Sequence, residues 1–184
     1  VSWHGVQGDG RGEAAAYLSP PPRNFTAGVY KFRSTMSGQL PTDDDLFRTI
    51  TIGIAGTAMD RYAALPERDR RALVAYLKSL SPRFAQEGAG QPIVFPASRP
   101  LTPESAARGR AAYERMQCAA CHGDGARGDG PLAADLSDTG GLPIRPADLT
   151  RPQLKGGHAP ESVFRSVMTG LDGTPMPSYG DSLT

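Results

Sequence analysis

The clearest helical pattern in the chain follows Pro66. Glu67 and Asp69 place acidic side chains in a first turn, where the positive end of a helix dipole favours them. The apolar residues that follow recur at intervals that share one face of a helix: Leu73, Val74, Tyr76, Leu77 and Leu80. The pattern predicts a helix with one apolar face.

Three further segments are predicted to be helical. Thr102 and Pro103 match the preferences of an N-cap and of the first helical position, so a helix is expected over 103–117. That segment is rich in alanine and arginine, and it leads directly into the first cysteine. The segments 43–52 and 160–169 both have acidic residues at their starts, which predicts two short helices.

The composition indicates a small hydrophobic core. Of 184 residues, 39% are hydrophobic, 22 are glycine and 17 are proline. A large apolar cofactor could therefore supply part of the core. The net charge of +1 leaves no electrostatic footprint for nucleic acid or an anionic membrane. No segment has the length and apolar content of a membrane span, and no signal peptide is recognisable. Since the sequence starts at Val1, a mature or trimmed form is expected.

The two cysteines belong to a C-x-x-C-H motif, formed by Cys118, Cys121 and His122. This motif is typical of haem c attachment, because two thiols at this spacing can each form a thioether to a haem vinyl group. The histidine then becomes an axial ligand of the iron. Two alternatives stay open. A structural zinc ion needs four ligands, and only His4 and His158 remain to complete such a site. A thioredoxin-like redox pair or a structural disulfide would use the cysteines alone.

An internal repeat relates the two halves of the chain. Short blocks occur twice in the same order, with an offset of 118 residues at the histidines and 117 at the methionines. The paired blocks are 4–10 and 122–130, 22–26 and 146–150, 46–50 and 163–167, and 56–62 and 173–179. Such regular order predicts a tandem duplication.

The repeat picks out one histidine and one methionine in each half: His4 and Met59, and His122 and Met176. A thioether is a neutral ligand that suits haem iron, and histidine–methionine ligation raises the reduction potential. Methionine more often fills a hydrophobic core. Both of these methionines instead lie in loops rich in glycine or proline, which favours axial ligation.

These motifs resemble a class I cytochrome c domain. The resemblance lies in the C-x-x-C-H motif with its following glycine, in the segment 146–150, and in Met176 followed by Pro177 and Tyr179. The duplicated chain resembles the bacterial di-haem cytochromes c. The resemblance implies an all-α fold of two tandem cytochrome c-like small helical domains, each wrapped around a haem site.

The chain is expected to divide into three segments. Domain 1 covers residues 1–82, a linker rich in proline and glycine covers 83–102, and domain 2 covers 103–184. Compared with the family pattern, domain 1 lacks its N-terminal helix and cysteine pair, and domain 2 lacks its C-terminal helix. The sequence is therefore expected to be truncated at both ends.

The first half departs from the pattern at Trp3, which stands where the second thiol is expected. In one interpretation His4 and Met59 still bind a haem, held by a single upstream thioether or by none. In another, the first half has lost its haem and Trp3 fills part of the space. In a third, Trp3 is a misassigned residue. The retained ligand pair favours a second haem c. Three arginines are candidates for the haem propionates: Arg23, Arg33 and Arg145.

The resemblance implies electron transfer rather than catalysis. With both axial positions filled, the iron would exchange single electrons between a redox protein donor and an acceptor, in the chain alone or as a subunit of a larger complex. Haem attachment to this motif in bacteria occurs outside the cytoplasm, which predicts a periplasmic or otherwise exported protein, with membrane association only through a partner or a missing segment. The main alternative is a di-haem peroxidase or gas-binding protein with one five-coordinate iron. A haem-less first half that only docks the second is a further alternative.

Overall fold

The computed structural model describes residues 2–96 and 100–183, and its regular structure is helical. In those ranges no β-strand is formed, and pairing is limited to two isolated bridges. The all-α fold is therefore confirmed. The elements are a short 3₁₀ helix η1 (Ala15–Tyr17) and the helices α1 (Asp43–Ile52), α2 (Glu67–Ser79), α3 (Pro82–Glu87), α4 (Pro103–Arg115), α5 (Ala119–His122) and α6 (Pro160–Thr169). None of the helices in the described parts has the length and apolar character needed to cross a membrane.

The predicted helices are found where the sequence patterns placed them. Helices α1 and α6 match the predicted ranges, and α2 begins directly after Pro66. Helix α4 begins at Pro103 and ends at Arg115, two residues earlier than predicted. Its N-cap Thr102 accepts a hydrogen bond from the backbone of Ser105, which explains the sharp start.

Helix α3 starts at the last residue of predicted domain 1 and continues into the segment that its proline and glycine content predicted to be linker. Pro82 occupies the start of the helix, where a missing N–H costs nothing. Phe84 is buried against the core beside Tyr30, with ring centroids 5.9 Å apart. The first part of the predicted linker therefore packs with the first half, and the division into two domains stays a prediction.

The hydrophobic core lies almost entirely in the first half. Its buried members come from the loop before α1 and from α1, α2 and α3: Tyr30, Leu40, Leu46, Ile50, Val74 and Phe84. Among the described residues of the second half, Ala133 is the one buried hydrophobic residue. Helix α4 buries none of its residues. The second half therefore has little apolar packing of its own.

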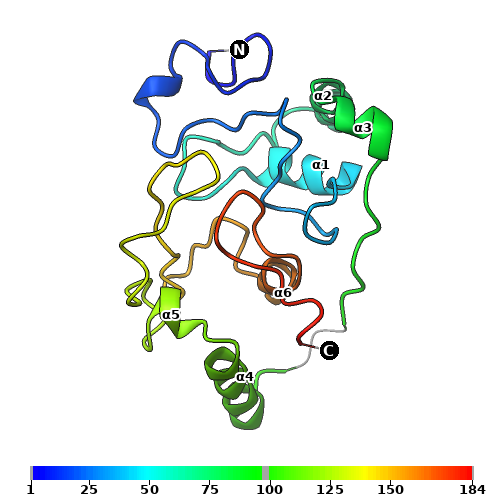
Figure 1. The fold of residues 1–184 in the computed structure, drawn as a ribbon. Coiled ribbons are helices and arrows are strands. Elements are labelled where there is room, and N and C mark those ends of the chain that lie inside the picture. The colour runs from blue at the N-terminus through cyan, green and yellow to red at the C-terminus, as the bar shows by residue number, and fades with distance from the viewer. Residues whose placement is uncertain (1, 97–99, 184) are drawn as a thin grey trace.

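The two halves contact each other through α1 and α6, which lie near the centre of the molecule in Figure 1. The guanidinium of Arg48 on α1 donates a 2.8 Å hydrogen bond to the hydroxyl of Ser162 on α6. Phe95, after α3, packs against Phe164 of α6 with ring centroids 6.0 Å apart. The segment after α3 is bonded to the first half at Gly90 and Ile93 and reaches the second half at Phe95.

Helix α1 should lose stability when its cap is removed. Thr42 Oγ1 accepts a 3.2 Å hydrogen bond from Asp45 N, and the Asp45 carboxylate accepts from Thr42 N at 3.1 Å. We expect Thr42→Ala to lower the free energy of unfolding by about 1 kcal/mol, the usual cost of losing an N-cap. Chemical denaturation followed by circular dichroism measures it. Thr42→Ser keeps the hydroxyl and should change stability much less; equal losses in both variants would contradict the capping role.

Candidate functional site

The cysteine motif forms a single helical turn after α4. Cys118 stands at the N-cap of α5, and Cys121 and His122 lie on the helix itself. Both cysteines are half-buried free thiols, so the structure shows no disulfide between them. Cys118 N donates to Tyr113 O at 3.0 Å, and the Tyr113 hydroxyl donates to Gly123 O at 2.6 Å. These two bonds hold both ends of the motif against the last turns of α4.

His122 is oriented by a backbone carbonyl. Its Nδ1 lies 3.0 Å from the carbonyl oxygen of Ala147. A carbonyl oxygen only accepts hydrogen bonds, so the proton is on Nδ1 and the lone pair is on Nε2. This is the usual arrangement for an imidazole whose other nitrogen binds a metal. His122 is therefore prepared for ligation through Nε2.

Met176 lies in a loop closed by its own hydrogen bonds. Leu171 N donates to Met176 O at 3.1 Å, the Thr174 hydroxyl donates to Leu171 O at 2.7 Å, and Met176 N donates to Thr174 Oγ1 at 3.2 Å. Pro175 and Pro177 flank the methionine and restrict the backbone further. These hydrogen bonds and the two prolines together define the backbone around the methionine.

Tyr179 brings the methionine segment next to the cysteine turn. Burial is the main cause that raises the pKa of the Tyr179 hydroxyl, and nearby Cys118 and Cys121 raise it further. Burial likewise raises the pKa of the Cys118 thiol, which interacts with Tyr179. The Cys118 thiol is thus neutral near pH 7. The segment after Met176 and the C-x-x-C-H motif therefore meet in one place.

In the first half, His4 has the same arrangement as His122. Its Nδ1 lies 3.0 Å from the carbonyl oxygen of Arg23, which again leaves Nε2 as the ligating nitrogen. The imidazole packs on Phe25, with ring centroids 4.5 Å apart. Burial lowers the pKa of His4, so the neutral form that binds metals predominates near pH 7.

The Met59 loop repeats the hydrogen bonds of the Met176 loop. Ile54 N donates to Met59 O at 2.9 Å, the Thr57 hydroxyl donates to Ile54 O at 2.8 Å, and Met59 N donates to Thr57 Oγ1 at 3.1 Å. The threonine two residues before each methionine thus fixes the loop in both halves. Sequence reasoning identified the methionines but not this role of the threonines.

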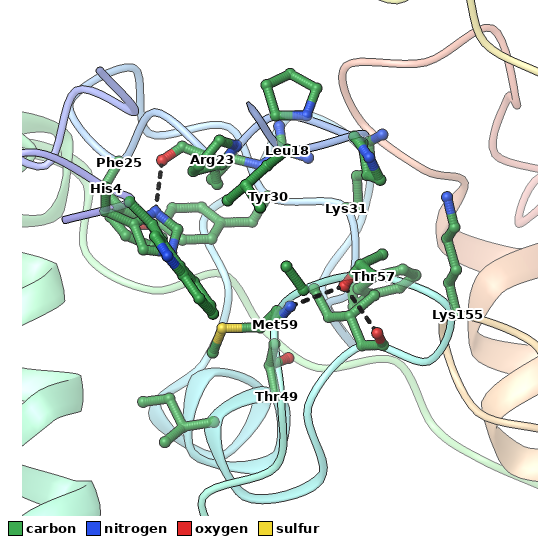
Figure 2. A pocket seen from close by; sticks show the side chains of 18 of the residues that line it. His4, Leu18, Arg23, Phe25, Tyr30, Lys31, Thr49, Thr57, Met59 and Lys155 are labelled. Atoms are coloured by element: carbon green, nitrogen blue, oxygen red, sulfur yellow. Dashed lines mark hydrogen bonds between the residues drawn. The ribbon is translucent and has the colours of Figure 1, made fainter. Parts of the chain in front are cut away.

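His4 and Met59 line the same cavity, which Figure 2 shows from close by. The cavity has a volume of about 170 Å³ and is partly open to solvent. The walls are mainly apolar and include Trp3, Leu18, Phe25, Leu46, Ile50 and Ile54. An imidazole and a thioether in the wall of one mainly apolar cavity are a donor set that suits haem iron.

The cavity also has basic side chains in its wall. Arg23, Lys31 and Lys155 line it, and Lys155 comes from the second half (Figure 2). Burial lowers the pKa of Lys31, and repulsion from Arg23 and Lys155 lowers it further. Three cations at one cavity suit a ligand with carboxylates, such as the haem propionates.

Tyr30 offers a further polar group at this cavity. Its side chain is buried, and within the described chain its hydroxyl has no hydrogen-bond partner. Burial raises the pKa of Tyr30 to about 12, so the hydroxyl keeps its proton. A buried donor without a partner is costly and favours a ligand that accepts from it. Tyr30 and the two lysines escaped sequence analysis, because nothing in their local patterns distinguishes them.

The structure separates the three arginines that were candidates for propionate contacts. Arg23 lines the cavity as expected. Arg33 does not, because its guanidinium is fully buried against backbone oxygens and Asp172 of the second half. The prediction for Arg33 was therefore wrong. Arg145 is exposed, as is His158 in the loop before α6.

Comparisons with known proteins agree with this geometry. Residues 104–184 match the family described as cytochrome c oxidase, cbb3-type, subunit III. Among solved structures, the chain is similar to a chain of the Kuenenia stuttgartiensis reducing HAO-like protein complex. The two are 40% identical, the match covers 99% of this chain and 83% of the other, and the TM-score is 0.95. No curated protein matches. The C-x-x-C-H motif on α5, the orientation of the His122 imidazole and the similarity to this relative lead to one family. The chain belongs to the c-type cytochromes, which bind haem c covalently and transfer electrons.

Proposed function

We propose that the chain is a di-haem electron carrier, with one haem in each half and no catalytic activity of its own. When bound, the haem supplies one-electron redox chemistry at its iron. The observation that carries the proposal is the cavity that places His4 and Met59 around one apolar space in the half without cysteines. His122 and Met176 would hold the iron in the second half, where Cys118 and Cys121 form the thioethers.

The hydrogen bonds around the two histidines support a tandem duplication. Gly10 N donates to His4 O at 2.9 Å, and Gly128 N donates to His122 O at 2.8 Å. The next pair of bonds joins Gly12 to Trp3 at 3.0 Å and Gly130 to Cys121 at 3.1 Å. Trp3 thus takes the backbone position of the second cysteine without supplying its thiol.

In the first half the protein would hold the haem by coordination and packing, with at most one thioether upstream of Trp3. His4 presents Nε2, and Met59 presents its sulfur from a loop fixed by Thr57. Arg23, Lys31 and Lys155 would neutralise the propionates. With His4 and Met59 both holding the iron, no position would be left for substrate, and the chemistry that the haem would supply is electron transfer.

The relative suggests a partner for this electron transfer. That relative is a chain of a reducing HAO-like protein complex. We propose that the chain is likewise a subunit that exchanges electrons with an HAO-like protein. Because attachment to C-x-x-C-H in bacteria occurs outside the cytoplasm, we further propose an exported, periplasmic location.

A redox titration with a haem count tests the proposal. We expect two haems per chain and two one-electron centres, both with a methionine–iron charge-transfer band in the red region of the oxidised spectrum. One haem per chain would contradict the di-haem assignment. Absence of the band together with rapid turnover of peroxide would favour the alternative, a di-haem peroxidase with a five-coordinate iron.

A further inference from the structure

Arg33 crosses from the first half into the second as a fully buried charge. Its relative exposure is 0%. Within its own half, Nε donates to Met36 O at 3.2 Å and Nη1 donates to Tyr30 O at 3.1 Å. Across the interface, Nη2 donates to Thr169 O at 2.8 Å and to Asp172 Oδ1 at 2.7 Å. The bonds within the first half fix the guanidinium, so it is a rigid anchor for what it meets in the second.

Asp172 is bound entirely by the first half. Besides Arg33, its carboxylate accepts from the Ser37 hydroxyl at 2.8 Å and from Gly38 N at 2.9 Å. The Asp172 side chain is 17% exposed, and the Arg33 side chain that it pairs with is 0% exposed. Three donors, one of them charged, fix both oxygens of the carboxylate. The backbone at Asp172 is therefore immobilised by contacts from outside its own half.

Asp172 belongs to the loop that presents Met176. Its neighbour Leu171 is bonded to Met176 through N and to Thr174 through O. The loop starts at Gly170, whose φ of 68° allows the backbone to approach the Met176 carbonyl closely. A shift at Asp172 would therefore move Leu171 and, through these bonds, the methionine.

The corresponding loop of the first half has no such anchor. Residues 53–59 and 170–176 align without a gap, and Ala55 stands at the position of Asp172. Ala55 is exposed. The hydrogen bonds inside the two loops are otherwise the same, so the cross-half carboxylate is a feature of the Met176 loop alone.

We propose that the first half positions Met176 on the iron of the second half through the bonds of Arg33, Ser37 and Gly38 to Asp172. This inference rests on the proposed His122–Met176 ligation. Asp172 acts through Met176 as a positioning residue. A ligand loop held from a second structural unit keeps its sulfur in place while the rest of the protein fluctuates. Methionine ligation in one half thereby depends on the other half.

The test compares Asp172→Ala with the wild type, both as full-length protein loaded with haem. The substitution gives the loop the residue found at Ala55. The share of the charge-transfer band that belongs to Met176 is first defined as the intensity lost in Met176→Leu. In Asp172→Ala we expect that share to disappear at a lower denaturant concentration than the helical circular dichroism signal. We also expect one reduction potential to fall, since methionine ligation raises it.

Two further variants keep the test decisive. Ser162→Ala removes a different hydrogen bond between the halves, the one from Arg48. In this variant the charge-transfer band and the helical circular dichroism signal should be lost at the same denaturant concentration. Should Asp172→Ala fail to fold, Ser37→Ala removes one donor and leaves the buried pair intact; the band should again be lost first, by a smaller margin.

The outcomes distinguish failure of the Asp172 inference from failure of the proposed ligation by Met176. If band and helix signal are lost together in Asp172→Ala and Ser37→Ala, with unchanged potentials, the contact is only structural and this inference is overturned alone. If Met176→Leu leaves the wild-type band unchanged, Met176 is no ligand, and the proposed function of the second half falls together with this inference.

Discussion

Replacing Cys118 and Cys121 together by serine should remove one covalently bound haem per chain. Serine hydroxyls cannot form the thioethers, and the motif contains both cysteines of the chain. The second half should also lose stability, because Ala133 is its one buried hydrophobic residue in the described ranges and the haem would supply much of its core. Mass spectrometry of the denatured protein counts the covalent haem, and far-UV circular dichroism reports the loss of structure.

The single variants Cys118→Ser and Cys121→Ser are the matched controls. Each leaves one thiol, so each should still carry a covalent haem on the second half, attached at one point. A double variant that keeps the full covalent haem content of the wild type would show that attachment occurs elsewhere and would refute the role of this motif.

Replacing His4 by leucine should remove one redox centre while the other remains. The leucine keeps an apolar side chain in the cavity but cannot bind iron, so Met59 alone would face the haem. If no thioether holds the first-half haem, we expect the haem content to fall by one per chain. If one upstream thioether holds it, we expect the haem to stay and its spectrum to lose the features of histidine–methionine ligation. A redox titration and the Soret absorbance per chain measure both effects.

His158→Leu is the control for this experiment, because His158 is exposed in the loop before α6. It should leave both centres and their potentials unchanged. If His4→Leu also leaves two centres with the wild-type titration, His4 is not a ligand and the first-half cavity has another use.

The sequence predicts those parts of the fold that depend on local signals. Helices α1, α4 and α6 begin with a capping residue, an acidic residue or a proline that acts within its own turn, so their starts could be located. Helix α3 was missed because its stability depends on Phe84 packing against Tyr30, a contact between distant segments. Composition alone made the same residues resemble a linker.

The residues of the candidate site likewise include some that the sequence identifies and some that only the three-dimensional structure reveals. The histidines and methionines could be found because the repeat presents each of them twice. Lys155 could not, because it reaches the first-half cavity from the second half, and no sequence pattern records that proximity. Arg33 was misassigned for a related reason. Its charge partner is Asp172, which is 139 residues away in the chain.

That separation along the chain has a consequence for synthesis and engineering. Translation proceeds from the N-terminus, so Arg33 leaves the ribosome long before Asp172 exists and must remain hydrated until the later segment arrives. The ion pair of Arg33 can thus form only after residue 172 has been made. For the same reason the halves are poor candidates for exchange as modules. A foreign second half would have to bring its own carboxylate to this position, or leave a buried guanidinium unpaired.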